Sequence, residues 1–226
     1  MNVTDVQGVV GVLASGGLDS CILISHLLRQ GRRIQPLYIR SQLVWERAEL
    51  KALSNYLNAV RSPKLRDLVT LDLPLADLYG SHWSMTGRGT PTSDAPDQDV
   101  FLPGRNALLL VKAAVWCQMH GVCELTLAPL ADNPFADSTP HFFRCAEALF
   151  NCYEGASIRI VLPFANFDKR QVMEHGRNDP LELTFSCISP VGDVHCGSCN
   201  KCAERQRAFC LIGLRDPTHY ANDRRI

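Results

Sequence analysis

Residues 8–20 read GVVGVLASGGLDS, and this stretch decides the fold that we expect. Residues 8–14 form a short, continuous apolar run, which is typical of a strand buried on both faces of a parallel sheet. The polar turn SGGLDS follows at residues 15–20, and a segment with helical leucine spacing then continues to a stop at Gly31. A buried strand, a glycine turn and a helix in this order predict the first unit of an α/β domain.

The same alternation continues through most of the chain. Further strands are expected at residues 34–39, 68–73, 124–128 and 157–162, and further helices at residues 43–59, 107–120, 139–152 and 169–177. Strands that alternate with helices predict a parallel sheet covered on both faces, and such sheets bind ligands at the carboxyl ends of their strands. Residues 74–103 are too long for a plain connection, so we expect either a lid over that edge or a mobile loop.

Composition excludes several classes of protein. The chain has 226 residues, of which 46% are hydrophobic, so it can bury a full core as one domain and is neither disordered nor membrane-like. Its 23 basic residues balance its 23 acidic ones, which argues against a broad nucleic-acid surface. No apolar run approaches the ~20 residues that span a bilayer. Residues 1–7 carry no basic region before the first apolar stretch, and no small-residue cleavage site stands out, so we expect a cytoplasmic protein.

The glycine turn has the composition of a pyrophosphate cradle. Gly16 and Gly17 let successive backbone N–H groups point inward, and the following helix adds its positive N-terminal end. The hydroxyls of Ser15 and Ser20 can donate to phosphate oxygens, whereas Asp19 would repel phosphate unless it caps the helix or approaches a metal cation. The Walker ending and the GxGxxG pattern are both absent. The alternative is a polar turn whose serines only cap a helix.

Ten cysteines are present, and a cytosolic chain keeps such thiols reduced or uses them as metal ligands. Six lie scattered in apolar segments and are expected to pack as small hydrophobic side chains. These six are Cys21, Cys117, Cys123, Cys145, Cys152 and Cys210.

The other four cysteines, Cys187, Cys196, Cys199 and Cys202, are clustered near the end of the chain. Four thiolates match the tetrahedral preference of a structural zinc ion, and they leave no need for the neighbouring His195. An iron–sulfur cluster is the alternative, although the Cys-x3-Cys-Pro that usually accompanies it is missing. We therefore expect a nucleotide-binding α/β domain at residues 1–180 and a zinc-binding tail at residues 181–226.

The turn SGGLDS after the first strand resembles the PP-loop of the ATP pyrophosphatases, which cleave ATP between its α and β phosphates and adenylate a substrate. The resemblance implies a parallel-sheet fold of the adenine nucleotide alpha hydrolase type, which is Rossmann-like. It also implies that the loop binds ATP with Mg²⁺. The ATP-binding residues would be Ala14, Ser15, Gly16, Gly17, Leu18, Asp19 and Ser20.

Three further motifs narrow the resemblance: FLPGRN at residues 101–106, ELTFSC at residues 182–187 and HCGSCNKCAERQRAF at residues 195–209. With the PP-loop, and in this order, they resemble the 7-cyano-7-deazaguanine synthase family. The resemblance implies an ATP-dependent carbon–nitrogen ligase that adenylates the carboxylate of 7-carboxy-7-deazaguanine. Ammonia would displace AMP to give an amide, and a second activation would dehydrate the amide to a nitrile. The zinc would be structural, and a homodimer is expected.

Adenylation needs cations near the α-phosphate and the departing pyrophosphate. We expect Arg105 and Lys169 to supply them, and together with Asp19 they form the predicted catalytic set. The predicted substrate-binding residues are Arg105, Asn106, Phe135 and Asp137. Asp137 could contact the amidine edge of a purine-like base while Phe135 stacks on it. The alternatives are solvated surface charges, a helix cap and a core aromatic residue.

The chain also departs from that family in two places. The family's DYGQRH segment corresponds to Tyr38-Ile39-Arg40-Ser41-Gln42-Leu43, without a following His, and the base-binding stretch at residues 133–142 lacks the family's Arg and Glu. Other functions therefore stay open. These are a PP-loop enzyme that thiolates a tRNA base, an amide-forming ligase for another carboxylate, and a nucleotide-binding protein without catalysis.

Overall fold

A computed structural model describes residues 8–153, 155 and 157–222 of the chain. Its centre is a five-stranded sheet in the order β3-β2-β1-β4-β5, in which every neighbouring pair is parallel. The strands are β1 (Val10–Leu13), β2 (Ile34–Arg40), β3 (Val69–Asp72), β4 (Glu124–Thr126) and β5 (Arg159–Val161). Val10 is in register with Ile34 on one side and with Glu124 on the other. The predicted parallel α/β fold is confirmed.

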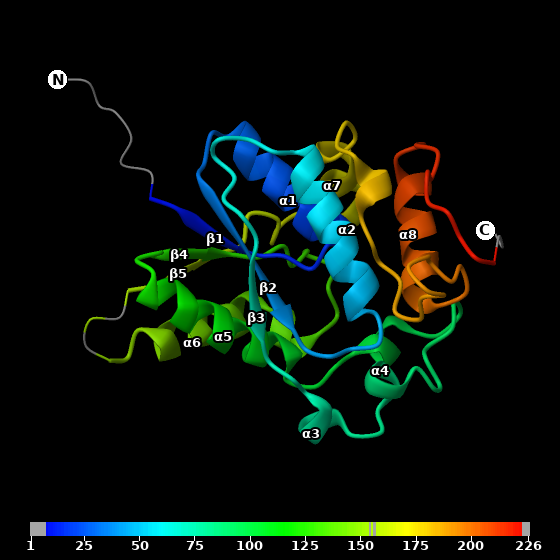
Figure 1. Ribbon diagram of the computed structural model, residues 1–226, viewed down its shortest axis with the longest axis horizontal. Coiled ribbons are helices and arrows are strands. Elements are labelled where there is room, and N and C mark those ends of the chain that lie inside the picture. Colours follow the sequence, from blue (N-terminus) through cyan, green and yellow to red (C-terminus); the bar gives the residue numbers. More distant parts are fainter. Residues whose placement is uncertain (1–7, 154, 156, 223–226) are drawn as a thin grey trace.

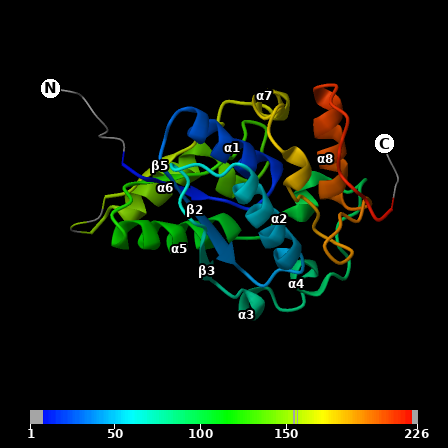
Figure 2. The ribbon, with the colours of Figure 1, turned by 45° about the horizontal axis from the view of Figure 1, so that its top comes forward.

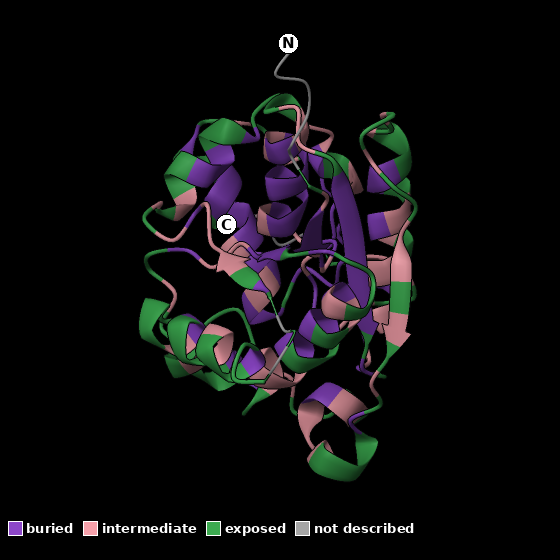
Figure 3. Ribbon diagram, turned by 90° about the vertical axis from the view of Figure 1, so that its left-hand side faces the viewer, coloured by how far each residue is buried: buried purple, intermediate pink, exposed green. Residues whose placement is uncertain are grey.

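Helices cover both faces of this sheet. Figure 1 shows α1, α2 and α7 on one face and α5 and α6 on the other. Their bounds are α1 (Leu18–Arg29), α2 (Glu46–Ala59), α5 (Arg105–Met119), α6 (Pro140–Phe150) and α7 (Lys169–His175). Burial is concentrated in the strands and in the helix surfaces turned toward them (Figure 3). The apolar runs of the sequence form strands because each strand is covered from both sides.

Residues 74–103, predicted to be a lid or a mobile loop, carry three short helices: α3 (Ala76–Tyr79), α4 (Trp83–Thr86) and η1 (Asp97–Val100). Backbone and side-chain hydrogen bonds fasten this segment to the cysteine-bearing tail. Ser93 N donates to Ser198 O at 2.9 Å, and Asn200 Nδ2 donates to Ala95 O at 2.8 Å. The segment is therefore held against the cysteine-bearing tail.

The tail contains η3 (Leu181–Leu183) and the helix α8 (Asn200–Leu211), which Figures 1 and 2 place at one end of the molecule beside α7. Phe209 of α8 is fully buried in the same core cluster as Val10 and Ile22. The hydrophobic core thus continues from the sheet into the tail. The boundary at residues 180 and 181 stays a prediction.

The prediction for the six scattered cysteines is correct for two and wrong for four. Cys21 and Cys117 are buried as expected. The other four are exposed, because Cys145 and Cys210 lie on helix faces turned away from the core, while Cys123 and Cys152 lie in the connections before β4 and after α6. None of the helices in the described part of the chain is both long enough and apolar enough to cross a lipid bilayer.

Candidate active site

The SGGLDS turn joins β1 to α1 at the carboxyl edge of the sheet. Gly16 has a φ of +77°, and a Cβ atom there would lie only 2.8 Å from the backbone oxygen of Glu49 in α2. The turn is closed internally, since Ser15 N donates to the hydroxyl of Ser20 at 3.2 Å. Gly17 caps the twelve-residue helix α1 in an extended conformation. The loop therefore presents backbone N–H groups at the positive end of a helix, as a phosphate site requires.

Two adjoining cavities open above this loop. One has a volume of about 290 Å³ and carries five aromatic side chains: Trp45, Trp83, Phe101, Phe135 and Phe185. The other, of about 320 Å³, is lined by residues at the carboxyl ends of β1, β2 and β4: Leu13, Ala14, Tyr38, Ile39, Leu127 and Ala128. Both are bordered by the loop and by the same charged side chains, including Asp19, Glu49, Arg105 and Lys201. Together they have the size and the mixed apolar and polar lining of a small-molecule site.

Most of the predicted site residues meet in this place. The first cavity is lined by Ser15, Gly17, Leu18, Asp19, Ser20, Arg105, Asn106, Phe135, Asp137 and Lys169. Ala14 lines the second cavity, whereas Gly16 lies behind the loop against α2 and lines neither. Gly16 therefore shapes the loop instead of facing a ligand. The roles assigned to all these residues stay predictions.

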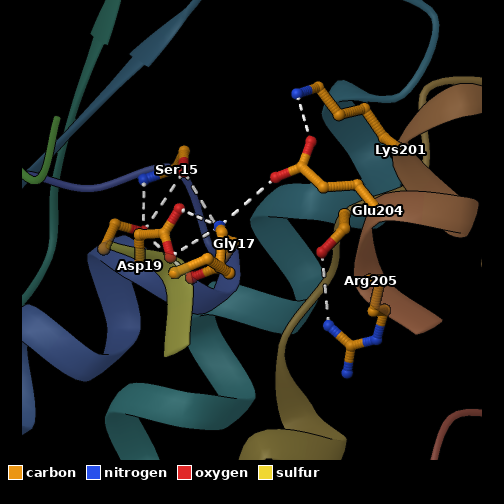
Figure 4. A network of polar contacts seen from close by, with 9 residues as sticks. Ser15, Gly17, Asp19, Lys201, Glu204 and Arg205 are labelled. Atoms are coloured by element: carbon orange, nitrogen blue, oxygen red, sulfur yellow. Dashed lines mark hydrogen bonds and ion pairs between the residues drawn. The ribbon is translucent and has the colours of Figure 1, made fainter. Parts of the chain in front are cut away.

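A network of opposite charges lies beside the loop (Figure 4). Lys169 Nζ donates to both carboxylate oxygens of Asp19, at 2.9 and 2.7 Å, and lies 3.2 Å from Glu204 Oε1. Lys201 Nζ contacts the other oxygen of Glu204 at 2.5 Å. The Asp19 carboxylate is thus held by an ammonium group, which reduces the repulsion that a phosphate in the loop would meet.

The pKa values of this network follow from burial and from its charges. Burial by itself lowers the pKa of Lys169, but the carboxylates of Asp19 and Glu204 outweigh it and raise that pKa above its ordinary value. Burial likewise raises the pKa of Glu204, while Lys169 and Lys201 bring it down to about 2. Lys169 and Glu204 are therefore both charged at neutral pH.

Arg105 is the first residue of α5 and follows Gly104, whose φ of +72° turns the chain into the helix. Its Nε atom is buried and has no hydrogen-bond partner among the described residues, so a ligand can supply one. The next residue, Asn106, is tied to Asp137: its backbone N–H donates to Asp137 Oδ2 at 3.3 Å and its side-chain amide to Asp137 O at 2.9 Å. The two predicted substrate-binding residues are thus already held together.

Glu49 is a site residue that the sequence did not single out. Its carboxyl accepts a 2.7 Å hydrogen bond from the hydroxyl of Tyr38. Burial raises the pKa of Glu49 to about 7, although Arg105 and the Tyr38 hydrogen bond both act to lower it. Glu49 therefore titrates in the neutral range.

Other residues of the site were also not predicted from the sequence. Trp45 and Trp83, to which no role was assigned, stack with ring centroids 5.8 Å apart in the wall of the aromatic cavity. Lys201 and Glu204 lie in the cysteine motif at residues 195–209, on either side of Cys202. This closeness to a predicted metal ligand was the signal that could have marked them as site residues. Arg205, also in that motif, is fully buried; it donates to Thr184, Thr218 and the backbone oxygen of Leu181.

The four clustered cysteines form a buried metal-binding constellation. Their Sγ atoms all lie within 4.8 Å of one another, and two of the pairs are 3.9 Å apart. A tetrahedral zinc site, with Zn–S bonds of about 2.3 Å, places its sulfurs roughly 3.8 Å apart. Backbone N–H groups of Ser189 and Ser198 donate to two of the sulfurs, which favours thiolates. Cys187, Cys196, Cys199 and Cys202 therefore fit a zinc ion, whereas His195 accepts a hydrogen bond from Ser186 N instead.

Comparisons with known proteins agree with this geometry. The chain is 27% identical over 93% of its length to 7-cyano-7-deazaguanine synthase 2 of Sulfurisphaera tokodaii, but it spans only 47% of that relative. It is 29% identical over 89% of its length to 7-cyano-7-deazaguanine synthase 1 of Desulfitobacterium hafniense, of which it covers 91%. A solved 4-thiouridine synthetase, in complex with RNA and ATP, shares the fold with a TM-score of 0.51 at 16% identity, covering 91% of this chain and 50% of that one.

The family match extends over nearly the whole chain. A model of the family described as queuosine biosynthesis protein QueC matches residues 9–213, a range that includes the loop, both cavities and all four clustered cysteines. The match and the geometry together lead to one conclusion: this chain belongs to the queuosine biosynthesis protein QueC family.

Proposed function

We propose that the protein is an ATP-dependent carbon–nitrogen ligase that converts 7-carboxy-7-deazaguanine and ammonia into 7-cyano-7-deazaguanine. One observation carries the proposal: a phosphate-binding loop and an aromatic-lined cavity share one set of charged residues, Asp19, Arg105 and Lys169. Curated relatives of similar length carry the name of this synthase. An enzyme that adenylates a planar, purine-like carboxylic acid needs these two compartments to adjoin.

The two cavities suit the two substrates. Adenosine fits the cavity at the carboxyl ends of β1, β2 and β4, where ligands of parallel sheets bind. The deazapurine fits the neighbouring cavity, where Phe135 and the stacked Trp45 and Trp83 offer flat apolar surfaces. Arg105 borders both cavities, so its guanidinium can contact the carboxylate and the α-phosphate where they meet.

The chemistry then proceeds by two activations. A carboxylate oxygen attacks the α-phosphorus of ATP, pyrophosphate leaves, and ammonia replaces AMP at the acyl carbon to form the amide. The amide oxygen attacks a second ATP in the same way, and loss of AMP gives the nitrile. Lys169 and Lys201, beside the loop, supply positive charge for the departing pyrophosphate.

The metal ions have separate tasks in this proposal. The four cysteines hold a structural zinc ion that has no open position and takes no part in the reaction. Magnesium accompanies ATP, and the carboxylate of Asp19 is the loop's own candidate ligand for it. The expected homodimer and a cytoplasmic location, where thiols stay reduced, are part of the same proposal.

The test is turnover with defined substrates. The purified protein is incubated with ATP, magnesium, ammonium and 7-carboxy-7-deazaguanine, and the products are separated by chromatography. We expect the nitrile together with two AMP for each nitrile formed, and no AMP when the deazapurine lacks its carboxylate. A folded, zinc-loaded protein that makes neither amide nor nitrile contradicts the proposal.

A further inference from the structure

Four carboxylates line the aromatic cavity, and two of them, Asp19 and Glu204, are paired with lysines. Asp19 is paired with Lys169, Glu204 is paired with Lys169 and Lys201, and Asp137 accepts the backbone N–H of Asn106. Glu49 and Asp137 form no ion pair within the described part of the chain, but Asp137 borders only the aromatic cavity, whereas Glu49 borders both cavities. Glu49 is therefore the carboxylate that lies at the junction of the two cavities without a cation paired to it.

The position of Glu49 suits that task. It comes from α2 and borders both cavities, as do Ser15 and Arg105. The hydroxyl of Tyr38 donates to Glu49 Oε2 at 2.7 Å, which fixes the carboxyl and leaves its other oxygen for a ligand. A fixed carboxyl at the junction of the adenosine cavity and the aromatic cavity lies where the acyl adenylate would form and react.

The proposed reaction needs a proton acceptor at this junction. When ammonia attacks the acyl adenylate, a C–N bond forms, the C–O bond to AMP breaks, and the nitrogen must lose one proton. In the second activation the adenylated amide loses AMP and both remaining N–H protons as the nitrile forms. Each of these steps is slow unless a base lies beside the nitrogen.

We propose that Glu49 is the general base that takes the proton from the nitrogen as ammonia adds and again as the nitrile forms. The inference rests on the proposed function and names a catalytic residue for it. In each step the carboxylate becomes a carboxylic acid, and it returns its proton to solvent before it accepts the next. No oxidant or further reactant is needed for this balance.

The surroundings of Glu49 support this role. Burial raises its pKa to about 7; Arg105 of α5 and the Tyr38 hydrogen bond from β2 oppose the rise, and Glu46 on the same helix adds to it. Cys21 of α1 also faces it, as a neutral thiol whose pKa burial raises. A base acts only when it is ionised, so amide and nitrile formation should increase as the pH rises through about 7.

The first experiment compares Glu49→Gln with the wild type in two assays. Pyrophosphate release without ammonia reports the first adenylation, and nitrile formation with ammonia reports the proton transfers. We expect the pyrophosphate burst within about threefold of wild type and nitrile formation reduced about 10²-fold or more. Glu46→Gln, one turn earlier on α2, is the matched control and should keep full turnover. A Glu49→Gln variant that makes nitrile within tenfold of wild type, or that loses both activities equally, overturns the proposal.

The second experiment does not require Glu49→Gln to fold. Tyr38→Phe removes the hydrogen bond that lowers the pKa of Glu49, so the inflection of the pH–rate profile should move to higher pH. Carboxyl ¹³C NMR of glutamate-labelled protein, without any substrate, should show a resonance that titrates near the same pH and moves with Tyr38→Phe. An unmoved inflection, or an ordinary pKa for Glu49, overturns the proposal. Absence of any pyrophosphate burst in the wild type would instead contradict the proposed function, and the NMR titration would still decide the state of Glu49.

Discussion

Replacing Gly16 with alanine should destabilise the protein through the close contact between the loop and α2. The residue has a φ of +77°, where an L-residue costs about 1–2 kcal/mol. Its new Cβ would also lie 2.8 Å from Glu49 O and 3.2 Å from Leu53 Cβ. The first of these is backbone that cannot rotate away, so overpacking adds about 1–3 kcal/mol. We therefore expect Gly16→Ala to lower the free energy of unfolding by about 2–5 kcal/mol.

Gly89→Ala is the matched control for this change. Gly89 has a similar φ of +73°, but nothing lies within 4 Å of the Cβ position, so only the conformational cost of about 1–2 kcal/mol applies. Urea unfolding followed by circular dichroism gives both values, provided that the slope of the transition is unchanged. Gly16→Ala should also weaken ATP binding, because Gly16 O accepts the backbone N–H of Phe185 at 2.8 Å and the loop would shift away from it. If the two variants unfold at the same urea concentration, the loop does not pack on α2 as described.

Three further predictions concern the charged network and the metal. Lys169→Met should keep the fold but reduce pyrophosphate release at least tenfold, because Asp19 loses its counter-ion beside the loop. A single-turnover assay measures this release, and an unchanged rate would remove Lys169 from the catalytic set. Cys199→Ala should lose the bound zinc and lower the melting temperature, and metal analysis that still finds one zinc per chain would contradict the ligand assignment. The pKa of Glu204 is about 2 in the folded protein, below the ordinary 4.5, so its ion pairs contribute fully to the free energy of unfolding above pH 4.5 and cease to contribute as the pH falls toward 2. Glu204→Gln should therefore reduce the loss of unfolding free energy between pH 4.5 and pH 2. An unchanged acid transition would show that the pairing contributes nothing.

The strands and most helices could be predicted because their physical signals are local. A parallel strand buried on both faces is a continuous apolar run, and all five were expected within a few residues of their bounds. The start of α5 was placed at residue 107 instead of 105, because the turn at Gly104 depends on backbone conformation. The predicted ATP and metal residues also came together, since a glycine turn between a buried strand and a helix is typical of phosphate sites and closely spaced cysteines are typical of metal sites.

Residues whose role depends on tertiary burial could not be predicted in this way. Glu49 lies in a helix rich in charged residues and would ordinarily be exposed, yet the loop and β2 cover it. Arg205 is likewise buried with its hydrogen bonds satisfied, which no local pattern indicates. Trp45 and Trp83 stack across a gap of nearly forty residues in the sequence, and only the fold brings them together.

We propose that the cysteine tail is a structural part of the predicted nucleotide site. Cys199 precedes the first residue of α8, and that helix carries Glu204 to Lys169 and, through it, to Asp19 of the loop. The hydrogen bond from Phe185 N to Gly16 O makes a second connection between the tail and the loop, close to Cys187. A metal ion held by four thiolates has no position left for a substrate, so its contribution is to fix where these two connections lie. In the proposed function, such positioning is why the predicted ATP loop near the start of the chain and the predicted metal site near its end belong together: the charged residues beside the loop come from both.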